Sequence, residues 1–364
     1  MIPVAEPFLG EEELANVTEA VKSGWISSKG RFIEEFENEF AKYCGVKYGV
    51  ATSNGTVTLH LALKALGIEA GDEVIVPDLT FVATANVVTY CNARPVFVDS
   101  HPQYWCVDPE KIEEKITPKT KAIMPVHLYG HPCDMEMILE IAEDYDLYVV
   151  EDAAESHGAE YKGKRVGSFG EINCFSFYGN KIISTGEGGM CVTKDEELAG
   201  KMRILRDHGM NPNKRYWYDV VGYNYRMTNL QAAIGVAQLR KLDRFVEKKR
   251  EIARLYEEGL SELAERGLIK LQPEMAWAKC VYWMYCILIE DKFGRSRNEL
   301  MKKLEENGIE TRPFFYPMHL IPPYESNKAF PAAEQISREG INLPSAVGLK
   351  EEEVKFILEK VKSG

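Results

Sequence analysis

Long apolar runs are absent from this sequence of 364 residues. No stretch approaches the roughly 18 consecutive apolar residues that a membrane-spanning helix needs, so we expect no membrane partner. The first residues, Met1 to Glu6, contain neither a basic cluster nor an apolar run, so they show no export signal. We therefore expect a cytoplasmic protein.

Closely spaced cysteine pairs are also absent. None of the eight cysteines forms a Cys-x-x-Cys pair, and scattered cysteines are typical of reduced, buried thiols in the cytosol. His127 and His131 have the spacing of two metal ligands on a helix. Because Pro125 and Pro132 bracket them, we predict no helix there and no metal site.

Basic residues are outnumbered, with 44 Lys and Arg against 56 Asp and Glu and a net charge of −12. Proteins that bind nucleic acids usually present a basic face, so we expect no nucleic-acid partner. A phosphorylated small molecule remains compatible, since it needs only a local positive site. The length allows two domains with a sizeable core.

Short apolar runs alternate with helical patterns between about residues 45 and 195. Each run is rich in Val and Ile and apolar throughout, which is typical of strands buried on both faces. The pattern predicts an α/β fold with a mainly parallel central sheet and crossover helices. The runs are 48–52, 73–77, 95–99, 122–126, 148–152 and 190–193.

A long helical pattern starts at Asn229 and extends to about Leu260, and strands mix with helices after it. We place a domain junction near residue 245. Residues 1–245 would form a large cofactor-binding domain, with the segment 1–30 near its active site. Residues 246–364 would form a smaller α+β domain.

One lysine and one aspartate carry the chemical prediction. Asp152 ends an apolar run, and Lys181 follows 29 residues later in a Ser-x₄-Lys motif that begins at Ser176. Pyridoxal phosphate (PLP) needs an amine for its aldehyde and a carboxylate that keeps its ring nitrogen protonated. Because ligands of open parallel sheets bind beyond the carboxyl ends of strands, the spacing favours PLP on Lys181 and Asp152. Alternatively, Asp152 caps the turn that follows it.

A phosphate site is indicated by the strand-turn-helix around Gly55 and Thr56. Amide groups at a helix N-terminus stabilise a phosphate, and the Ser176 hydroxyl could join them. A plain capped turn is the alternative. Phe81 could stack on the pyridine ring, or it could be an ordinary core aromatic.

Around these residues the chain resembles the DegT/DnrJ/EryC1/StrS family of PLP-dependent nucleotide-sugar aminotransferases, from Pro3 to about Val361. The resemblance implies the aspartate-aminotransferase (type I) fold. Within the family the similarity is greatest to the branch that forms GDP-perosamine. The segments that carry the resemblance are 24–30, 126–135, 175–189, 222–229 and 311–319.

The resemblance also implies roles for cofactor residues. Lys181 would hold the PLP aldehyde, Asp152 would pair with the pyridinium, and Phe81 would stack on the ring. Ser176 and the amides of Gly55 and Thr56 would hold the phosphate. Glu155 would lie near the ring hydroxyl, at a position where many members carry Gln. Asn224 would reach the phosphate in the neighbouring subunit, so the expected assembly is a homodimer.

The implied substrates are L-glutamate and a nucleotide-linked 4-keto-6-deoxy sugar. The amino group would pass through pyridoxamine phosphate to C4 of GDP-4-dehydro-6-deoxy-D-mannose, giving GDP-perosamine for a surface polysaccharide. The residues expected to line the sugar-nucleotide site are Trp25, Ser28, Lys29, Arg226, Tyr316 and His319.

Several alternatives stay open at this point. The sugar could be linked to UDP or dTDP, because the sequence contains no base-reading pattern. The protein could be a non-catalytic, PLP-bound regulator. A decarboxylase or lyase is a third possibility, but the segments around Trp25 and His319 favour a sugar nucleotide.

Overall fold

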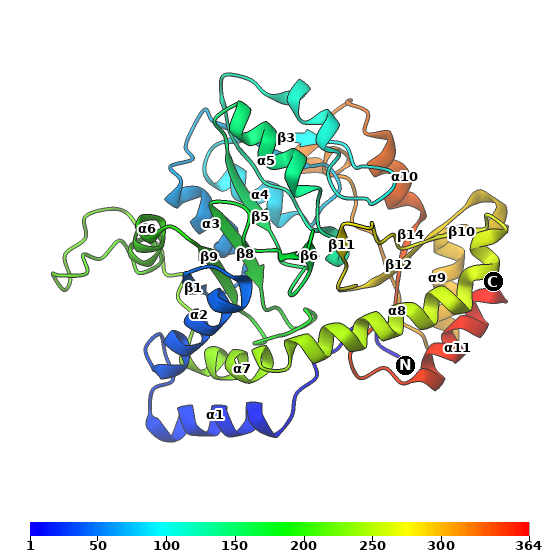
Figure 1. The fold of residues 1–364 in the computed structure, drawn as a ribbon, viewed down its shortest axis with the longest axis horizontal. Coiled ribbons are helices and arrows are strands. Elements are labelled where there is room, and N and C mark those ends of the chain that lie inside the picture. Colours follow the sequence, from blue (N-terminus) through cyan, green and yellow to red (C-terminus); the bar gives the residue numbers. More distant parts are fainter. Residues whose placement is uncertain (364) are drawn as a thin grey trace.

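A seven-stranded sheet forms the centre of the chain in this computed structural model, which describes residues 1–363 (Figure 1). Its strand order is β1-β9-β8-β5-β4-β2-β3, and β9 alone runs antiparallel to its neighbours. The prediction of a mainly parallel sheet is therefore confirmed. The strands are β1 (Tyr48–Thr52), β2 (Glu73–Pro77), β3 (Arg94–Val98), β4 (Thr120–Ile123), β5 (Tyr148–Asp152), β8 (Ile172–Ser176) and β9 (Gly189–Thr193).

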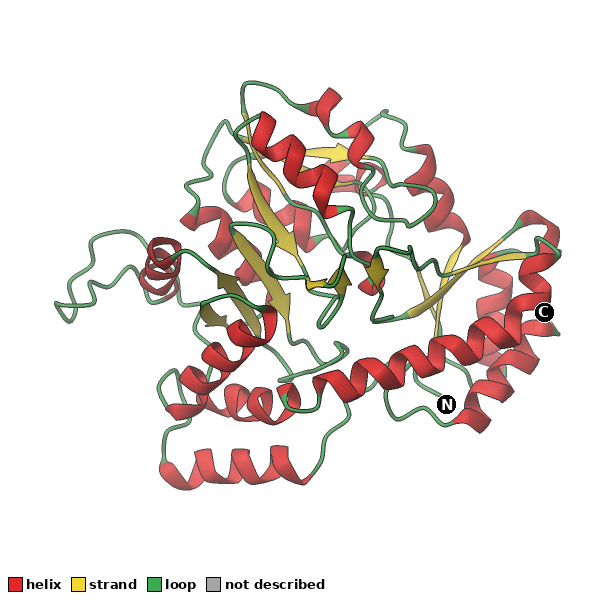
Figure 2. Cartoon of the chain, viewed as in Figure 1, coloured by secondary structure: helices red, strands yellow, loops and turns green. Residues whose placement is uncertain are grey.

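Helices cover both faces of this sheet (Figure 2). Successive strand residues point to opposite faces, so Ile75 of β2 joins one apolar core while Val74 and Val76 join another. Helices α3, α4 and α6 contribute to the second core, and α2, α5 and α7 to the first. The bounds are α1 (Glu11–Ser23), α2 (Arg31–Cys44), α3 (Gly55–Ala65), α4 (Ala83–Tyr90), α5 (Met135–Asp144), α6 (Glu196–Arg206) and α7 (Asn229–Leu239).

A four-stranded antiparallel sheet forms the C-terminal part, with the order β10-β12-β14-β13. Helices α8, α9 and α11 pack with it around a third apolar core. The elements are α8 (Leu242–Glu265), β10 (Ile269–Leu271), β12 (Tyr285–Ile289), α9 (Arg297–Glu306), β13 (Arg312–Pro313), α10 (Pro331–Glu339), β14 (Gly340–Leu343) and α11 (Glu351–Lys362).

The two parts of the chain are joined by more than one connection. Helix α8 runs unbroken across the predicted junction at residue 245. Strand β11 (Ala278–Lys279) pairs with β6 (Glu160–Tyr161), which pairs with β7 (Lys164–Arg165). Trp283 and Phe314 also pack in the first core of the large sheet. The division into two domains at residue 245 therefore stays a prediction.

Short 3₁₀ helices complete the described secondary structure: η1 (Pro109–Lys111), η2 (Glu113–Lys115), η3 (Leu128–Gly130), η4 (Asp291–Phe293), η5 (Met318–Leu320) and η6 (Pro322–Tyr324). All eight cysteines are buried and free. Within residues 1–363, no helix combines the length and apolar character that a membrane crossing requires.

Candidate active site

A cavity of about 660 Å³ lies beyond the carboxyl ends of β1, β5 and β8. Seven of the eight residues predicted to bind the cofactor line it, and Asn224 does not. The seven are Gly55, Thr56, Phe81, Asp152, Glu155, Ser176 and Lys181.

The cavity wall between β1 and α3 can hold a phosphate. Asn54 caps α3, since its Oδ1 accepts the amide of Val57 at 3.0 Å. The first amides of a helix have no intrahelical acceptor, so those of Gly55 and Thr56 are available to an anion. A Cβ on Gly55 would lie 2.7 Å from Cβ of Ser176 and 2.9 Å from its Oγ. Glycine therefore lets the helix start approach the Ser176 hydroxyl.

Lys181 extends into the same cavity from the turn after β8. Its Nζ lies 3.9 Å from Oε1 of Glu155 and 3.8 Å from the ring centroid of Trp283. Burial lowers the pKa of Lys181, although the carboxylates of Glu155 and Asp152 act in the opposite direction. A lowered pKa increases the fraction of neutral amine, which is the form that attacks an aldehyde.

Asp152 is held at both of its carboxylate oxygens. Oδ2 accepts the Thr84 hydroxyl at 2.8 Å, and Oδ1 accepts the amide of Ala154 at 3.2 Å. The second bond is the cap of the next turn that the sequence left open as an alternative, and it coexists with a position in the cavity wall. Burial raises the pKa of Asp152, while the hydrogen bond from Thr84 acts against this shift.

Glu155 completes a row of ionisable groups with Lys181 and Asp152. Its Oε2 accepts the amide of Tyr129 at 2.8 Å. Burial raises the pKa of Glu155 to about 7, and the Lys181 ammonium opposes this rise. The carboxyl group can therefore change its protonation state near neutral pH.

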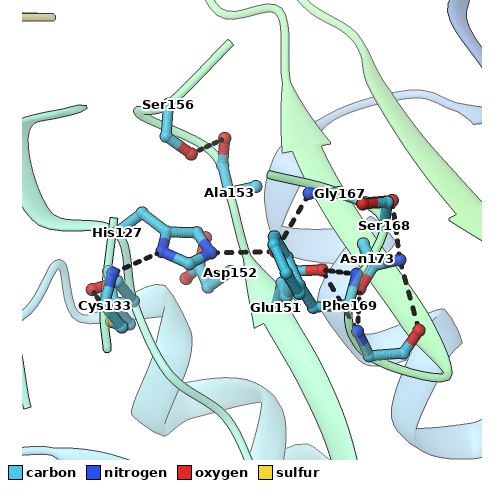
Figure 3. Close-up of polar contacts among 12 residues, drawn as sticks. His127, Cys133, Glu151, Asp152, Ala153, Ser156, Gly167, Ser168, Phe169 and Asn173 are labelled. Atoms are coloured by element: carbon cyan, nitrogen blue, oxygen red, sulfur yellow. Dashed lines mark hydrogen bonds and ion pairs between the residues drawn. The ribbon is translucent and has the colours of Figure 1, made fainter. Parts of the chain in front are cut away.

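A buried hydrogen-bond network lies on the other side of β5 (Figure 3). Glu151 contacts Nε2 of His127 at 3.0 Å and accepts the amides of Gly167 and Phe169. Nδ1 of His127 accepts the amide of Cys133. These bonds fix the end of β5, and therefore Asp152, relative to the loops around it.

A protein-family model matches residues 7–362, and it describes the DegT/DnrJ/EryC1/StrS aminotransferase family. The chain belongs to this family. The family predicted from the sequence is therefore confirmed. Aminotransferases of this family depend on PLP.

Two curated relatives are GDP-perosamine synthases. The one from Caulobacter vibrioides is 50% identical over 98% of this chain and 96% of its own length. The one from Escherichia coli O157:H7 is 50% identical over 99% of this chain and 97% of its own length.

Solved structures of aminotransferases superimpose on the whole chain. TlmJ from Streptoalloteichus hindustanus gives a TM-score of 0.94 at 33% identity and covers 100% of this chain and 98% of its own. The PLP form of Spr1654 from Streptococcus pneumoniae gives 0.93 at 28% identity, covering 100% and 98%. The predicted type I aminotransferase fold is confirmed.

The donor set of this family member fits PLP. The cavity offers free helix amides and a hydroxyl for the phosphate, a carboxylate for the ring nitrogen and a buried amine for the aldehyde. The Phe81 side chain is 52% exposed, and its ring lies 5.7 Å from that of Phe315 at the cavity edge. A flat face is therefore available for a ring system.

The residues predicted to contact the sugar nucleotide lie outside this cavity in the single chain. Trp25 and Tyr316 are 57% and 64% exposed. The loop of Trp25, Ser28 and Lys29 is held against the start of α7 by Asn229, whose Nδ2 donates to the Trp25 carbonyl at 2.7 Å. Their substrate role stays a prediction.

The segment between α6 and α7 projects from the body beside α6 (Figure 1). Asn224 and Arg226 lie where this segment returns to the body, since Asn224 forms a β-bridge with Asp207 and Arg226 forms one with Thr52. Oδ1 of Asn224 accepts from the Arg226 guanidinium at 3.1 Å, and Arg226 pairs with Asp207 at 2.7 Å. Asn224 is exposed and available to another molecule.

His319 occupies a position that the sequence did not suggest. Its side chain is 2% exposed, and Nδ1 lies 2.7 Å from Oδ2 of Asp78 while Nε2 lies 3.3 Å from Glu334. Its amide also donates to Asp78. This geometry joins the segment 312–320 to the end of β2 and leaves no face of the imidazole on the cavity.

The sequence did not single out part of the cavity wall. Tyr129, Trp283, Met284, Arg312, Phe315 and Asn342 all line it. Arg312 falls in a segment that carried the family resemblance. A guanidinium next to a proline-rich loop was the only sequence feature that could have indicated its position at the cavity. Trp283 and Asn342 lack any local signal, because they reach the cavity through the packing of the C-terminal sheet.

Proposed function

We propose that this chain transfers the amino group of L-glutamate to C4 of GDP-4-dehydro-6-deoxy-D-mannose, giving GDP-perosamine for a surface polysaccharide. The observation that carries this proposal is the placement of the Lys181 amine and the Asp152 carboxylate in one cavity with an anion cradle. The 50% identity to two GDP-perosamine synthases supports the choice of nucleotide sugar.

The residues that would hold the cofactor come from the strand ends. Gly55, Thr56 and Ser176 bind the phosphate, Phe81 covers the ring, and Asp152 orients and charges the ring nitrogen. When bound, PLP supplies an aldehyde that accepts the amino group as pyridoxamine phosphate, together with a ring that withdraws electrons.

Lys181 moves the proton of the reaction. Its Nζ would act as the base that carries a proton between the two carbons flanking the transferred nitrogen. Burial lowers the pKa of this amine, which favours its neutral, basic form. Trp283 covers the amine and excludes water from it.

Arg312 is the natural anchor for the amino donor. L-glutamate carries two carboxylates, and among the described cavity-lining residues the only cations are Lys181 and Arg312. The guanidinium contacts Oε1 of Glu310 at 3.2 Å through one nitrogen, which leaves other donors for a carboxylate.

A homodimer would complete the site. Asn224 would reach the cofactor phosphate of the neighbouring subunit, and Trp25, Ser28, Lys29, Arg226 and Tyr316 would meet the sugar nucleotide. The projecting segment that precedes Asn224 exposes Tyr216 and Val221, at 69% and 90%. Exposed apolar side chains on a projecting segment are typical of a surface that another chain covers.

Glutamate-dependent amination of GDP-, UDP- and dTDP-linked 4-keto-6-deoxyhexoses tests the proposal. We expect the GDP-linked sugar to give a kcat/KM at least about tenfold higher than the others, which corresponds to about 1.4 kcal/mol. If a UDP- or dTDP-linked sugar gives the highest kcat/KM, the proposed substrate is wrong, but the assignment as an aminotransferase still holds.

Glutamate alone separates the enzyme from a regulator. An aminotransferase converts its bound cofactor, and the visible absorption of the protein changes in one turnover. A protein that keeps its spectrum in excess glutamate would be the non-catalytic regulator. A decarboxylase would instead release carbon dioxide from one of a panel of amino acids.

A further inference from the structure

Lys249 of α8 is a buried ammonium with unusual partners. Its side chain is 4% exposed. Its Nζ donates to the carbonyl of Trp283 at 2.9 Å and to the carbonyl of Ser345 at 2.6 Å. No carboxylate within residues 1–363 forms an ion pair with it. Since lysine is almost never fully buried without a paired charge, this position calls for an explanation.

Trp283 is the partner that faces the active site. Its amide donates to the carbonyl of Tyr129 at 3.1 Å, and its indole Nε1 donates to the carbonyl of Asn180 at 2.7 Å. The indole face lies 3.8 Å from Nζ of Lys181, which follows Asn180 in the chain. Lys249 therefore contacts the main chain of the residue whose ring covers the reactive amine.

We propose that Lys249 is a positioning residue that fixes the main chain of Trp283, so that the indole covers Nζ of Lys181. The inference rests on the proposed function, because Lys181 must be the amine that receives PLP. The side chain joins three segments that are distant in sequence, namely α8, the approach to β12 and the segment after β14.

An amine suits this position better than an apolar side chain. A methionine would fill a similar volume but leave two buried carbonyls without a donor. Burial lowers the pKa of Lys249 to about 7, and the neutral amine still has two N–H groups for its two acceptors. The contacts therefore persist in both protonation states.

Lys249→Met and the control Tyr256→Phe test the inference. Tyr256 also lies on α8, and its hydroxyl donates to the carbonyl of Pro344 at 2.9 Å, next to Ser345. The control thus removes a buried hydrogen bond from the same helix to the same segment without a bond to Trp283.

The first measurement uses the protein without cofactor. The fluorescence emission of Trp283 is obtained by subtracting the spectrum of the same protein with Trp283→Phe from the spectrum of each protein. We expect Lys249→Met to shift this emission to longer wavelength, since a loosened indole meets more water, and Tyr256→Phe to leave it unchanged.

The second measurement is the rate of PLP uptake, followed by visible absorption. We expect Lys249→Met to slow uptake about tenfold, as is typical when a supporting residue behind a functional group is lost. Tyr256→Phe should stay within about twofold. In the Trp283→Phe background, Lys249→Met should add no further slowing, because both changes act through one contact.

Three results would overturn the inference. The emission and the uptake rate could be unchanged in Lys249→Met, or Tyr256→Phe could slow uptake equally. In the Lys249→Met, Trp283→Phe double variant, the slowing factors of the two single variants could multiply. If Lys249→Met does not fold, Lys249→Gln, whose shorter side chain keeps an amide NH₂ group, enters the same cycle. Uptake by the unaltered protein separates the two proposals. If that protein takes up no PLP, the proposed function fails, whereas normal uptake with an indifferent Lys249→Met refutes only the positioning role.

Discussion

Two walls of the same cavity are built in different ways. The wall made by the large sheet places Gly55, Asp152 and Ser176 at strand ends, where the backbone itself fixes their positions. The C-terminal wall carries Trp283 and Arg312 on short segments. The positions of those segments depend on hydrogen bonds from side chains that are distant in the sequence.

The second wall therefore depends on a few long-range links. Lys249 bonds carbonyls 34 and 96 residues away, and His319 bonds Asp78 across 241 residues. Connecting segments vary more among related proteins than the strands and helices they join, so a wall built from short segments can vary with the substrate. Changes in the first wall should therefore alter PLP binding, and changes in the second should alter substrate binding.

The largest effect should come from the first wall. Lys181→Ala should lower kcat by about four orders of magnitude or more, because the proton transfer loses its base. Steady-state amination of the GDP-linked sugar measures this loss. Lys201→Ala, a change at an exposed lysine of α6, is the control, and an active Lys181→Ala would refute the mechanism.

Gly55→Ala should weaken PLP binding by about a hundredfold. The new Cβ would lie 2.7 Å from Cβ of Ser176, so the helix start must move away from the phosphate. Equilibrium titration with PLP measures the dissociation constant. Gly179→Ala is the matched control, since its Cβ would meet nothing closer than a carbonyl oxygen at 3.9 Å. Equal weakening in the two variants would argue against the cradle.

In the second wall, Arg312→Gln should raise KM for L-glutamate by about ten- to a hundredfold. A charge-assisted hydrogen bond to a carboxylate contributes about 1.5–3 kcal/mol. The dissociation constant of PLP should change less than about twofold, which sharpens the contrast with Gly55→Ala. The exposed Arg338, changed to Gln, serves as control. A loss of PLP affinity in Arg312→Gln would contradict the proposal that the first wall binds PLP and the second binds the substrate.

His319→Asn tests the link between the two walls. Loss of the bridge between Asp78 and Glu334 should lower the free energy of unfolding by about 1–3 kcal/mol. KM for the sugar nucleotide should rise only a few-fold, because the segment 312–320 loosens. Denaturant unfolding and steady-state kinetics measure the two effects. A higher KM with unchanged stability would instead favour the prediction that His319 contacts the substrate.

A pH-dependent effect on stability concerns Glu155 in the cofactor-free protein. Burial raises the pKa of Glu155 from its ordinary value near 4.5 to about 7. Between these pH values the folded protein binds more protons than the unfolded chain, so stability falls as pH rises. The free energy of unfolding relative to Glu155→Gln should therefore decrease from pH 4.5 to 7 and then level off. Denaturant titrations at several pH values check this, and a flat difference would contradict it.

The cofactor wall was largely predictable from the sequence. Asp152 ends an apolar run, Gly55 opens a helix after a strand, and Lys181 follows Ser176 in the turn after β8, and the structure brings all four residues to one cavity. The family resemblance added Glu155. The resemblance also placed His319 in the sugar-nucleotide site. The structure buries its side chain between two carboxylates, and its substrate role stays a prediction.

The sequence alone determined the α/β fold, its mainly parallel sheet and the residues at the strand ends. Strand periodicity and turn chemistry depend on residues that are close in sequence, so they can be recognised from the sequence alone. Only the tertiary structure decided which C-terminal residues meet Lys181. Trp283, Arg312 and Asn342 reach the cavity through contacts between segments far apart in sequence. No local pattern records such contacts, because their free energy depends on the folded arrangement of the whole chain.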